Sequence, residues 1–240
     1  NRAKILENIN QNIRISPNVY YLLLDTYPRS DVLKEFYNIN NYLFLEKLTK
    51  KGYLISNNSK SNAIGTEISM STVFSMDLKY AKKTILNKEN IYKDLWLKGN
   101  TTVHSIFKKI GYKNFISFDN TIQGAACLKS NKKNNKIDKC IGPKIRFTEV
   151  ENNFLKSTPI IDILGKFFPS FFAYEFLYLD FINESLDDLV LSNKSFFYYI
   201  HLIMPHPPPK FNENCEKKID VFKINVKDKF FDDGAKKGMR

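Results

Sequence analysis

"NVYYLLLDTYPRSDVL", residues 18–33, is the stretch that decides the fold. Residues 19–24 are apolar without interruption and rich in Tyr, Leu and Val, which predicts a short strand buried on both faces of a parallel sheet. The run ends on Asp25. Residues just past the carboxyl ends of such strands line the ligand crevice of open α/β sheets, so Asp25 is a candidate ligand or base. The open alternative is that Asp25 caps a helix starting near Ser30.

The rest of the chain alternates between helical and strand patterns. Apolar residues at helical spacing predict one helix from Ser30, a plausible cap, to Gly52, and a short strand is expected directly after it, at the start of "YLISNNSKS". Further along, the patterns predict a helix within 66–80, a helix ending at Gly111 followed by a strand within 101–119, and a buried strand ended by prolines within 195–209. This alternation predicts an α/β/α sandwich with a mostly parallel central sheet.

Composition limits the classes of function. The chain has 240 residues, 43% of them hydrophobic, and a net charge of +12. The charge is spread over segments such as "KKNNKIDK" (132–139) rather than gathered on one helix with aromatic residues, so no nucleic-acid partner is predicted. Attraction to an anionic membrane surface is the functional alternative to a generally Lys/Asn-rich composition. No apolar run reaches the roughly 18 residues of a transmembrane helix.

The three cysteines, Cys127, Cys140 and Cys215, do not have the spacing of a metal site. Cys127 and Cys140 bracket a polar loop that a disulfide would hold in an oxidising compartment. Two free thiols are the open alternative.

Thr66 is the second candidate site residue. It follows Gly65 at the junction between a loop and a helix, where backbone amides attract anions such as phosphate or sulfate. Coordination to a metal held by Asp25 would activate its hydroxyl as a nucleophile. The competing interpretation is a plain threonine N-cap, with Glu67 favoured by the helix dipole.

The histidines give a third candidate. His201 lies within the apolar strand, where a core histidine is the favoured interpretation, and His104 is expected at a helix surface or in packing. His206 differs because it follows the strand, at the sheet edge predicted for Asp25, and the flanking prolines fix its backbone. An imidazole presented in this way can bind an anionic oxygen or a metal.

Three blocks together carry a resemblance: "NVYYLLLDTYPRSDVL" (18–33), "FLEKLTKKGYLISNNSKSNAIGTEISMSTVFSM" (44–76) and "FFYYIHLIMPHPPPKF" (196–211). In their order and intervals they resemble the alkaline phosphatase superfamily, specifically the sulfatase-like branch that includes membrane-anchored lipoteichoic acid synthases and phosphoethanolamine transferases. Residues 81–190 match only in general character.

The resemblance implies a role for each candidate. Asp25 would be the first ligand of a divalent metal ion (Zn, Mn or Mg), and Thr66 the metal-bound nucleophile that forms a covalent intermediate. His206 would bind the oxygens of the transferred group, and Asn62 and Ser61 would contact the substrate. The expected substrate is a phosphorylated lipid or an envelope glycan, and the expected location is extracytoplasmic, on the periplasmic or outer face of the cytoplasmic membrane.

Departures from the family pattern refine this expectation. Thr26 stands where true sulfatases carry a second acid, and Thr66 replaces their Cys or Ser, which favours phosphoryl over sulfuryl transfer. The downstream Asp-His pair is absent: Asp232 and Asp233 precede Gly234, but no histidine follows. The metal site is therefore expected to be incomplete and the chain as given inactive or impaired. A non-catalytic remnant that binds an anion or a glycan is the alternative.

The expected organisation follows from the same comparison. Residues 1–17 read as a polar connector, possibly after an absent membrane region, and residues 18–240 as the N-terminal part of a sulfatase-like catalytic domain. The aromatic stretch at residues 167–182 is either an interfacial element or a cover over the sheet.

Overall fold

The structure is a computed structural model that describes residues 7, 17–63, 65–78, 99–118, 136–141, 186, 189, 194–202 and 214. The chain divides into two compact units. Unit 1 comprises Asn1–Asp25 and Asn62–Met204, and unit 2 comprises Thr26–Ser61 and Pro205–Arg240. The predicted connector (1–17) and the domain expected after it (18–240) stay predictions. The aromatic stretch at 167–182 lies outside the described residues.

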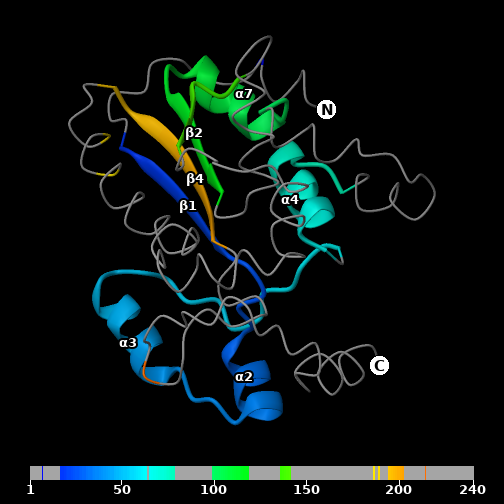
Figure 1. Ribbon diagram of the computed structural model, residues 1–240, viewed down its shortest axis with the longest axis vertical. Helices are drawn as coiled ribbons and strands as arrows, with labels where there is room; N and C mark the ends of the chain where they lie inside the picture. The colour runs from blue at the N-terminus through cyan, green and yellow to red at the C-terminus, as the bar shows by residue number, and fades with distance from the viewer. Residues whose placement is uncertain are drawn as a thin grey trace, which may run out of the picture. The chain divides into compact units, whose positions relative to one another are not determined.

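Unit 1 contains a parallel sheet (Figure 1). Its strands are β1 (Val19–Leu24), β2 (Lys113–Phe118), β3 (Lys139–Ile141) and β4 (Phe196–Leu202). They lie in the order β1-β4-β2-β3, and every described pair is parallel. Together with the helices beside the sheet, this confirms the predicted mostly parallel α/β fold.

The two strands nearest the candidate site differ in burial. All seven residues of β4 are buried between neighbours on both sides, as their continuous apolar run predicted. β1 was expected to be buried on both faces, and this was wrong, because Tyr20 and Leu22 are exposed. β1 lies at the edge of the described sheet, with a strand on one side only. Val19, Tyr21 and Leu23 pack against the core cluster on one face, and Leu24 packs against the cluster on the other.

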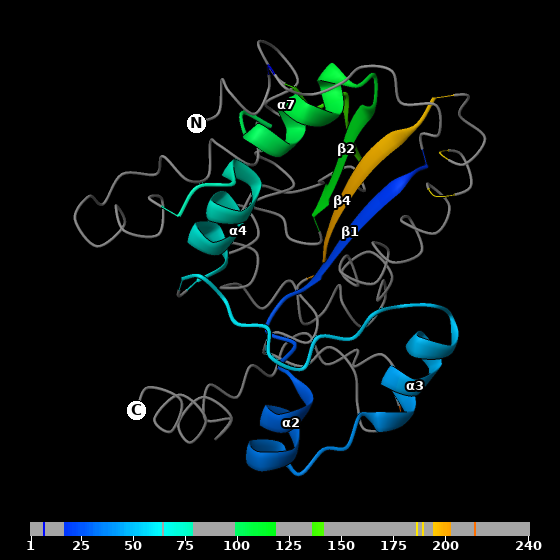
Figure 2. The same cartoon turned by 180° about the vertical axis from the view of Figure 1, so that it is seen from behind.

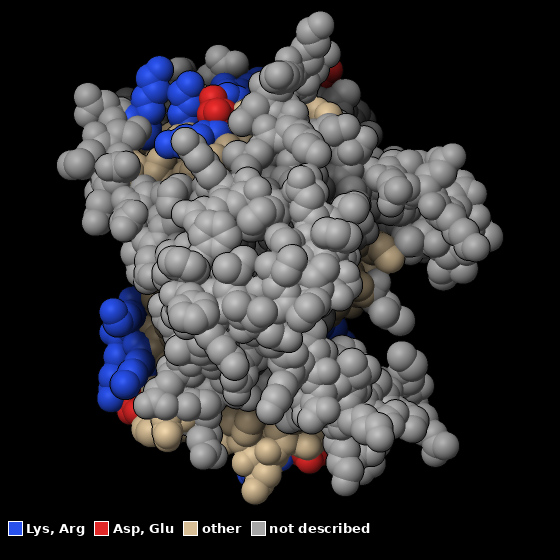
Figure 3. Space-filling model, in the orientation of Figure 1, with Lys and Arg blue, Asp and Glu red and all other residues tan. Residues whose placement is uncertain are grey.

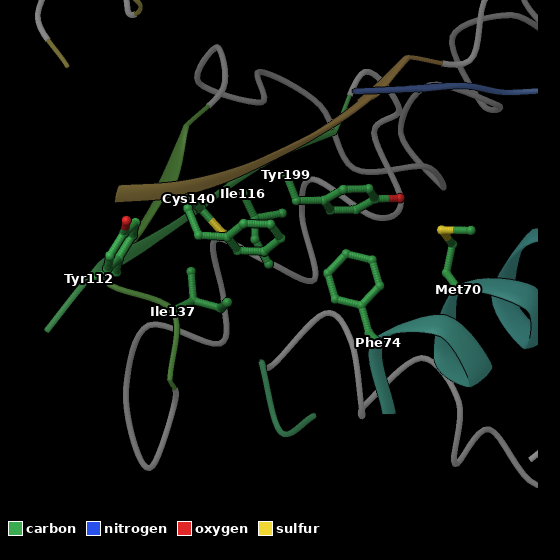
Figure 4. Close-up of a cluster of buried hydrophobic side chains, with 8 residues drawn as sticks. Met70, Phe74, Tyr112, Ile116, Ile137, Cys140 and Tyr199 are labelled. Atoms are coloured by element: carbon green, nitrogen blue, oxygen red, sulfur yellow. The ribbon is translucent and has the colours of Figure 1, made fainter. Parts of the chain in front are cut away.

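Helices α4 (Thr66–Ser75) and α7 (Thr102–Lys109) pack on one face of the sheet (Figures 1 and 2). Phe107 of α7 stacks on Phe197 of β4 with ring centroids 4.4 Å apart, and Phe74 of α4 contacts Tyr199 at 5.0 Å. Figure 4 shows Phe74 and Met70 of α4 facing Tyr199 within this core. A separate cluster covers the opposite face: Phe115, Ile141, Leu189, Phe196, Tyr198, Ile200 and Leu202.

Unit 2 corrects two expectations. The single helix predicted from Ser30 to Gly52 is two helices, α2 (Ser30–Tyr37) and α3 (Tyr42–Lys50). Asn38 ends α2 in the left-handed conformation, with φ of 54°, a backbone state that asparagine adopts more readily than most residues. The side chain of Asn40 accepts a hydrogen bond from the backbone of Tyr42 and so offers an alternative to helical bonding.

The strand expected after Gly52 is not formed. Residues 53–56 are irregular, and Leu54 is fully exposed to solvent rather than buried in a sheet. The predicted elements of unit 1 are confirmed, although α4 ends at Ser75, before the end of the predicted window. Among the described helices, none combines the length and the apolar character that crossing a bilayer requires.

Candidate active site

The register of β1 on β4 brings Asp25 to His201. Leu23 pairs with His201, and the backbone N–H of Asp25 donates to the carbonyl of Leu202 at 2.8 Å, so the ladder continues one residue past β1. Because side chains alternate along a strand, the odd-numbered residues of both strands face α4. Nε2 of His201 lies 3.5 Å from Oδ2 of Asp25.

Helix α4 supplies the third side chain. Its N-cap is Gly65, whose φ of 90° and ψ of 140° favour glycine over any residue with a side chain. Thr66 is the first residue of the helix, and its hydroxyl donates a hydrogen bond of 3.0 Å to Oδ1 of Asp25. These two residues are 41 positions apart in the chain. A conformationally permissive glycine thus lets the loop enter α4 with the threonine directed at the carboxylate.

Neither Asp25 nor Thr66 is the helix cap that the alternative interpretations proposed. The N-cap of α4 is Gly65 rather than Thr66. The N-cap of α2 is Arg29, which makes no side-chain capping bond, and the Asp25 carboxylate instead contacts Thr66 and His201. The first turn of an α-helix also leaves backbone N–H groups without intrahelical partners, which favours an anion near Thr66.

Burial sets the electrostatics of the site. The side chain of His201 is 1% exposed, whereas that of Asp25 keeps 17% of its surface open to solvent. Burial raises the pKa of the Tyr199 phenol well above its ordinary value, and the charges of Tyr21 and Asp25 raise it further. Burial also raises the pKa of Tyr21. Both phenols therefore stay neutral at physiological pH and form an uncharged wall on the α4 face of the sheet, beside Asp25.

The side-chain oxygens of Asp25 and Thr66 are suitable ligands for part of a divalent-cation site. Oδ1 of Asp25 and the hydroxyl of Thr66 are hard oxygen ligands 3.0 Å apart, a separation at which both can contact one cation. Among the described residues there is no group of three or more His, Cys, Asp or Glu side chains that could hold a metal ion. Asp25 and Thr66 are thus placed where they could supply two ligands to one cation, and the described residues show no complete metal site.

The other candidates are less fully placed. Ser61 and Asn62 are exposed residues of the loop before α4, and His206, Asp232 and Asp233 lie outside the described residues. The proposed roles of Ser61, Asn62 and His206 stay predictions.

Cysteine pairing is partly resolved. Cys140 of β3 is disulfide-bonded, and the other two cysteines of the chain, Cys127 and Cys215, lie outside the described residues.

Sequence reasoning missed the position of His201. Its burial agrees with the favoured interpretation as a core histidine, but the same side chain borders Asp25. The sequence did show that both residues lie near the carboxyl ends of apolar strands, Asp25 directly after β1 and His201 one residue before the end of β4. The carboxyl ends of parallel strands meet at one sheet edge. His104 is fully buried and stacks on Phe74, so of the two expectations for it, packing was right.

Comparison with known proteins identifies the family. The sulfatase family model matches residues 17–232, which is most of the chain. Searches of curated proteins and of solved structures found no match. Sulfatase-family members generally use divalent metal ions and act on sulfuryl or phosphoryl esters. The chain belongs to the sulfatase family, in the sulfatase-like branch of the alkaline phosphatase superfamily.

Proposed function

We propose that this chain carries the nucleophile half of a metal-dependent enzyme that transfers or hydrolyses a phosphoryl-type ester through a covalent intermediate on Thr66. The hydrogen bond from Thr66 to Oδ1 of Asp25 carries the proposal. It joins a nucleophile candidate at a helix N-terminus to a carboxylate at a strand end, which is the pairing that phosphoryl transfer on a metal-bound hydroxyl requires.

The residues present support a two-step reaction. In the first step the Thr66 oxygen forms a bond to phosphorus while the bond from phosphorus to the ester oxygen breaks. The proton lost by the Thr66 hydroxyl, which points at Asp25, is balanced by the one that the leaving ester oxygen takes up. The hydrogen bond to Asp25 directs the hydroxyl proton away from the incoming phosphorus and leaves the oxygen lone pairs available. The N-terminal amides of α4 are positioned to stabilise negative charge next to Thr66.

In the second step a water or an acceptor hydroxyl forms a new bond to phosphorus as the bond between phosphorus and the Thr66 oxygen breaks. The proton lost by the attacking oxygen restores the Thr66 hydroxyl. A divalent cation held by Asp25 and Thr66 would lower the pKa of the hydroxyl and neutralise developing charge. His201 orients the Asp25 carboxylate from the opposite side. Threonine in place of the Cys or Ser of sulfatases supports phosphoryl over sulfuryl transfer.

The substrate we propose is a phosphorylated lipid or an envelope glycan, met on the extracytoplasmic face of the cytoplasmic membrane. The disulfide at Cys140 supports an oxidising compartment. The net charge of +12 supports contact with an anionic surface.

Metal binding measured by calorimetry tests the proposal first. We expect Zn or Mn to bind the full chain and the affinity to fall at least about tenfold in Asp25→Ala and in Thr66→Ala. Asp31→Ala and Thr49→Ala are matched controls, because both side chains are exposed and lie in unit 2. Equal affinities in the parent and the Asp25→Ala variant would contradict the assignment.

Trapping of the intermediate tests the nucleophile separately. After incubation with a phosphodiester substrate, Mn and an acid quench, mass spectrometry should find a phosphoryl group on the peptide that contains Thr66. Thr66→Ala should abolish this label and lower turnover by about a thousandfold or more, while Thr66→Ser should retain part of both. A label on another residue would exclude the proposed intermediate.

A second candidate is a non-catalytic remnant that binds an anion or a glycan. One observation favours it, namely that the described residues bring only one carboxylate to Thr66. This candidate predicts binding of inorganic phosphate or a glycan without metal and without a labelled peptide. A phosphate affinity that rises with added Mn favours the enzyme instead.

A further inference from the structure

The segment Tyr42–Leu54 of unit 2, which comprises α3 and the turn after it, exposes large apolar side chains to solvent. Leu54 is 99% exposed, Leu43 70%, Tyr42 62% and Tyr53 60%. No residue of α3 is fully buried. Phe44 is also exposed, so five large apolar side chains lie within thirteen consecutive residues. Scattered exposed leucines are ordinary, but a patch of this size marks an interaction surface.

Lysines lie among these apolar side chains. Lys47, Lys50 and Lys51 are all exposed, and Glu46, the one acid of the segment, makes an ion pair of 2.9 Å with Lys50. Helical residues three and four positions apart share a face, so Leu43, Lys47 and Lys50 lie on one face of α3. Figure 3 shows basic side chains gathered over α3. The segment is thus apolar and basic at the same surface.

We propose that Tyr42–Leu54 docks on an anionic lipid surface. Leucine and tyrosine side chains enter the boundary between headgroups and acyl chains, while lysine ammonium groups extend from their apolar stems to the lipid phosphates. Each lysine near such a surface strengthens binding by roughly fivefold. The inference concerns unit 2 alone and does not depend on a metal or on Thr66, so it stands or falls separately from the proposed reaction.

Charge complementarity favours a membrane over a protein partner. In a symmetric dimer formed through this patch, the three lysines of one copy would face the same lysines of the other, and like charges brought together weaken association. Lysine is also depleted in the cores of protein interfaces, where aromatic side chains and arginine are enriched. An anionic bilayer accepts the leucines and the lysines at the same time.

Co-sedimentation with vesicles tests this inference on the full 240-residue chain. We expect binding to vesicles of phosphatidylcholine mixed with phosphatidylglycerol, and much weaker binding to phosphatidylcholine alone or at high salt. The double variant Leu43→Ser, Leu54→Ser should bind at least about tenfold more weakly, and Lys47→Gln, Lys51→Gln about twenty-five-fold more weakly. Leu78→Ser and Lys139→Gln are matched controls, because both are exposed in unit 1.

Three outcomes would overturn the inference. The first is a parent chain that does not bind anionic vesicles, and the second is unchanged binding in both patch variants. The third is a patch that is covered by protein: a large loss of thermal stability in the leucine variant would mean that it packs against another part of the chain. A change from dimer to monomer in size-exclusion chromatography would mean that it joins two copies. Unchanged stability and a monomeric parent that binds vesicles support it.

Discussion

Two polar clusters on the α4 face of the sheet each contain a buried histidine, and their partners differ. The first, here called the His104 cluster, consists of Thr101, His104, Asn114 and Lys136. Nδ1 of His104 lies 2.6 Å from the hydroxyl of Thr101, and the Asn114 amide donates to the backbone carbonyls of His104 and Lys136, both at 3.0 Å. The Asn114 side chain on β2 therefore satisfies backbone carbonyls of α7 and of the segment before β3.

The second cluster, Asp25, Thr66 and His201, comes from three distant segments, and its side chains are directed at one another. Its carboxylate also remains partly open to solvent, whereas His104 and Asn114 are fully buried. The contrast separates a cluster that holds the fold together from one that leaves a charged group available to a ligand. Burial of a histidine alone does not distinguish the two.

Among the variants that test this difference between the clusters, Asn114→Ala is expected to have the largest effect on stability. The change removes two hydrogen bonds, one to the buried carbonyl of His104 and one to the partly buried carbonyl of Lys136, so the free energy of unfolding should fall by about 3 kcal/mol. Urea denaturation measures this, with the exposed Asn57→Ala as control, for which a change within about 0.5 kcal/mol is expected. A loss below about 1 kcal/mol would mean that the His104 cluster does not hold α7 to β2.

A smaller effect, mainly on function, is expected for His201. In His201→Leu the carboxylate of Asp25 loses its neighbour, and metal affinity should fall about tenfold to a hundredfold. His201→Gln keeps an N–H donor and should restore part of the affinity. Calorimetry with Zn measures both variants, and circular dichroism checks their folding. If both variants bind as the parent does, His201 is a packing residue like His104, and the contrast between the clusters fails.

A third effect, which is small for each pH unit, is a pH dependence that arises from His104. Burial lowers the pKa of the His104 imidazole to about 3, and the charge of Lys136 contributes in the same direction. In the unfolded chain the His104 imidazole takes up a proton near pH 6.5, whereas in the folded chain it stays neutral there. Acid therefore favours unfolding. The stability that the neutral, buried His104 contributes is fully present above pH 6.5 and is lost as the pH falls towards about 3.

Between these limits His104 should lower the free energy of unfolding by about 1.4 kcal/mol for each pH unit of acidification. Urea denaturation of the parent and of His104→Gln over this range isolates the contribution, since carboxylates titrate in both proteins. Parallel pH profiles would show that His104 is protonated in the folded state as it is in the unfolded one.

The prediction of the fold succeeded where the pattern was long or ended at a clear stop. β4 is seven residues long and wholly apolar apart from His201, and the strand β2 follows the helix stop at Gly111. The prediction failed in unit 2, where apolar residues recur at helical spacing both before Asn38 and after Asn41 although two separate helices form. The spacing of apolar residues indicates which of them could lie on one helix face. It does not predict that Asn38 adopts the left-handed conformation that ends α2.

The positions of Asp25 and Thr66 could be predicted because they follow from chain order, and the roles of both residues stay predictions. Asp25 ends a strand and Thr66 begins a helix, and each position is visible in the sequence. His201 was set aside as core because its pairing with Leu23 depends on which strand lies beside β1 and in what register. β1 and β4 are far apart in the chain, and no local pattern reports that they are neighbours.

The sequence by itself determined the mostly parallel α/β architecture and the candidate carboxylate and hydroxyl, because these depend on apolar runs, turn residues and residue identity. Only the tertiary structure decided that Asp25, Thr66 and His201 meet on the α4 face, and that Tyr42–Leu54 presents its leucines to solvent. The physical reason is that strand order, register and side-chain exposure arise from packing between distant segments, whereas sequence periodicity reports only on neighbours along the chain.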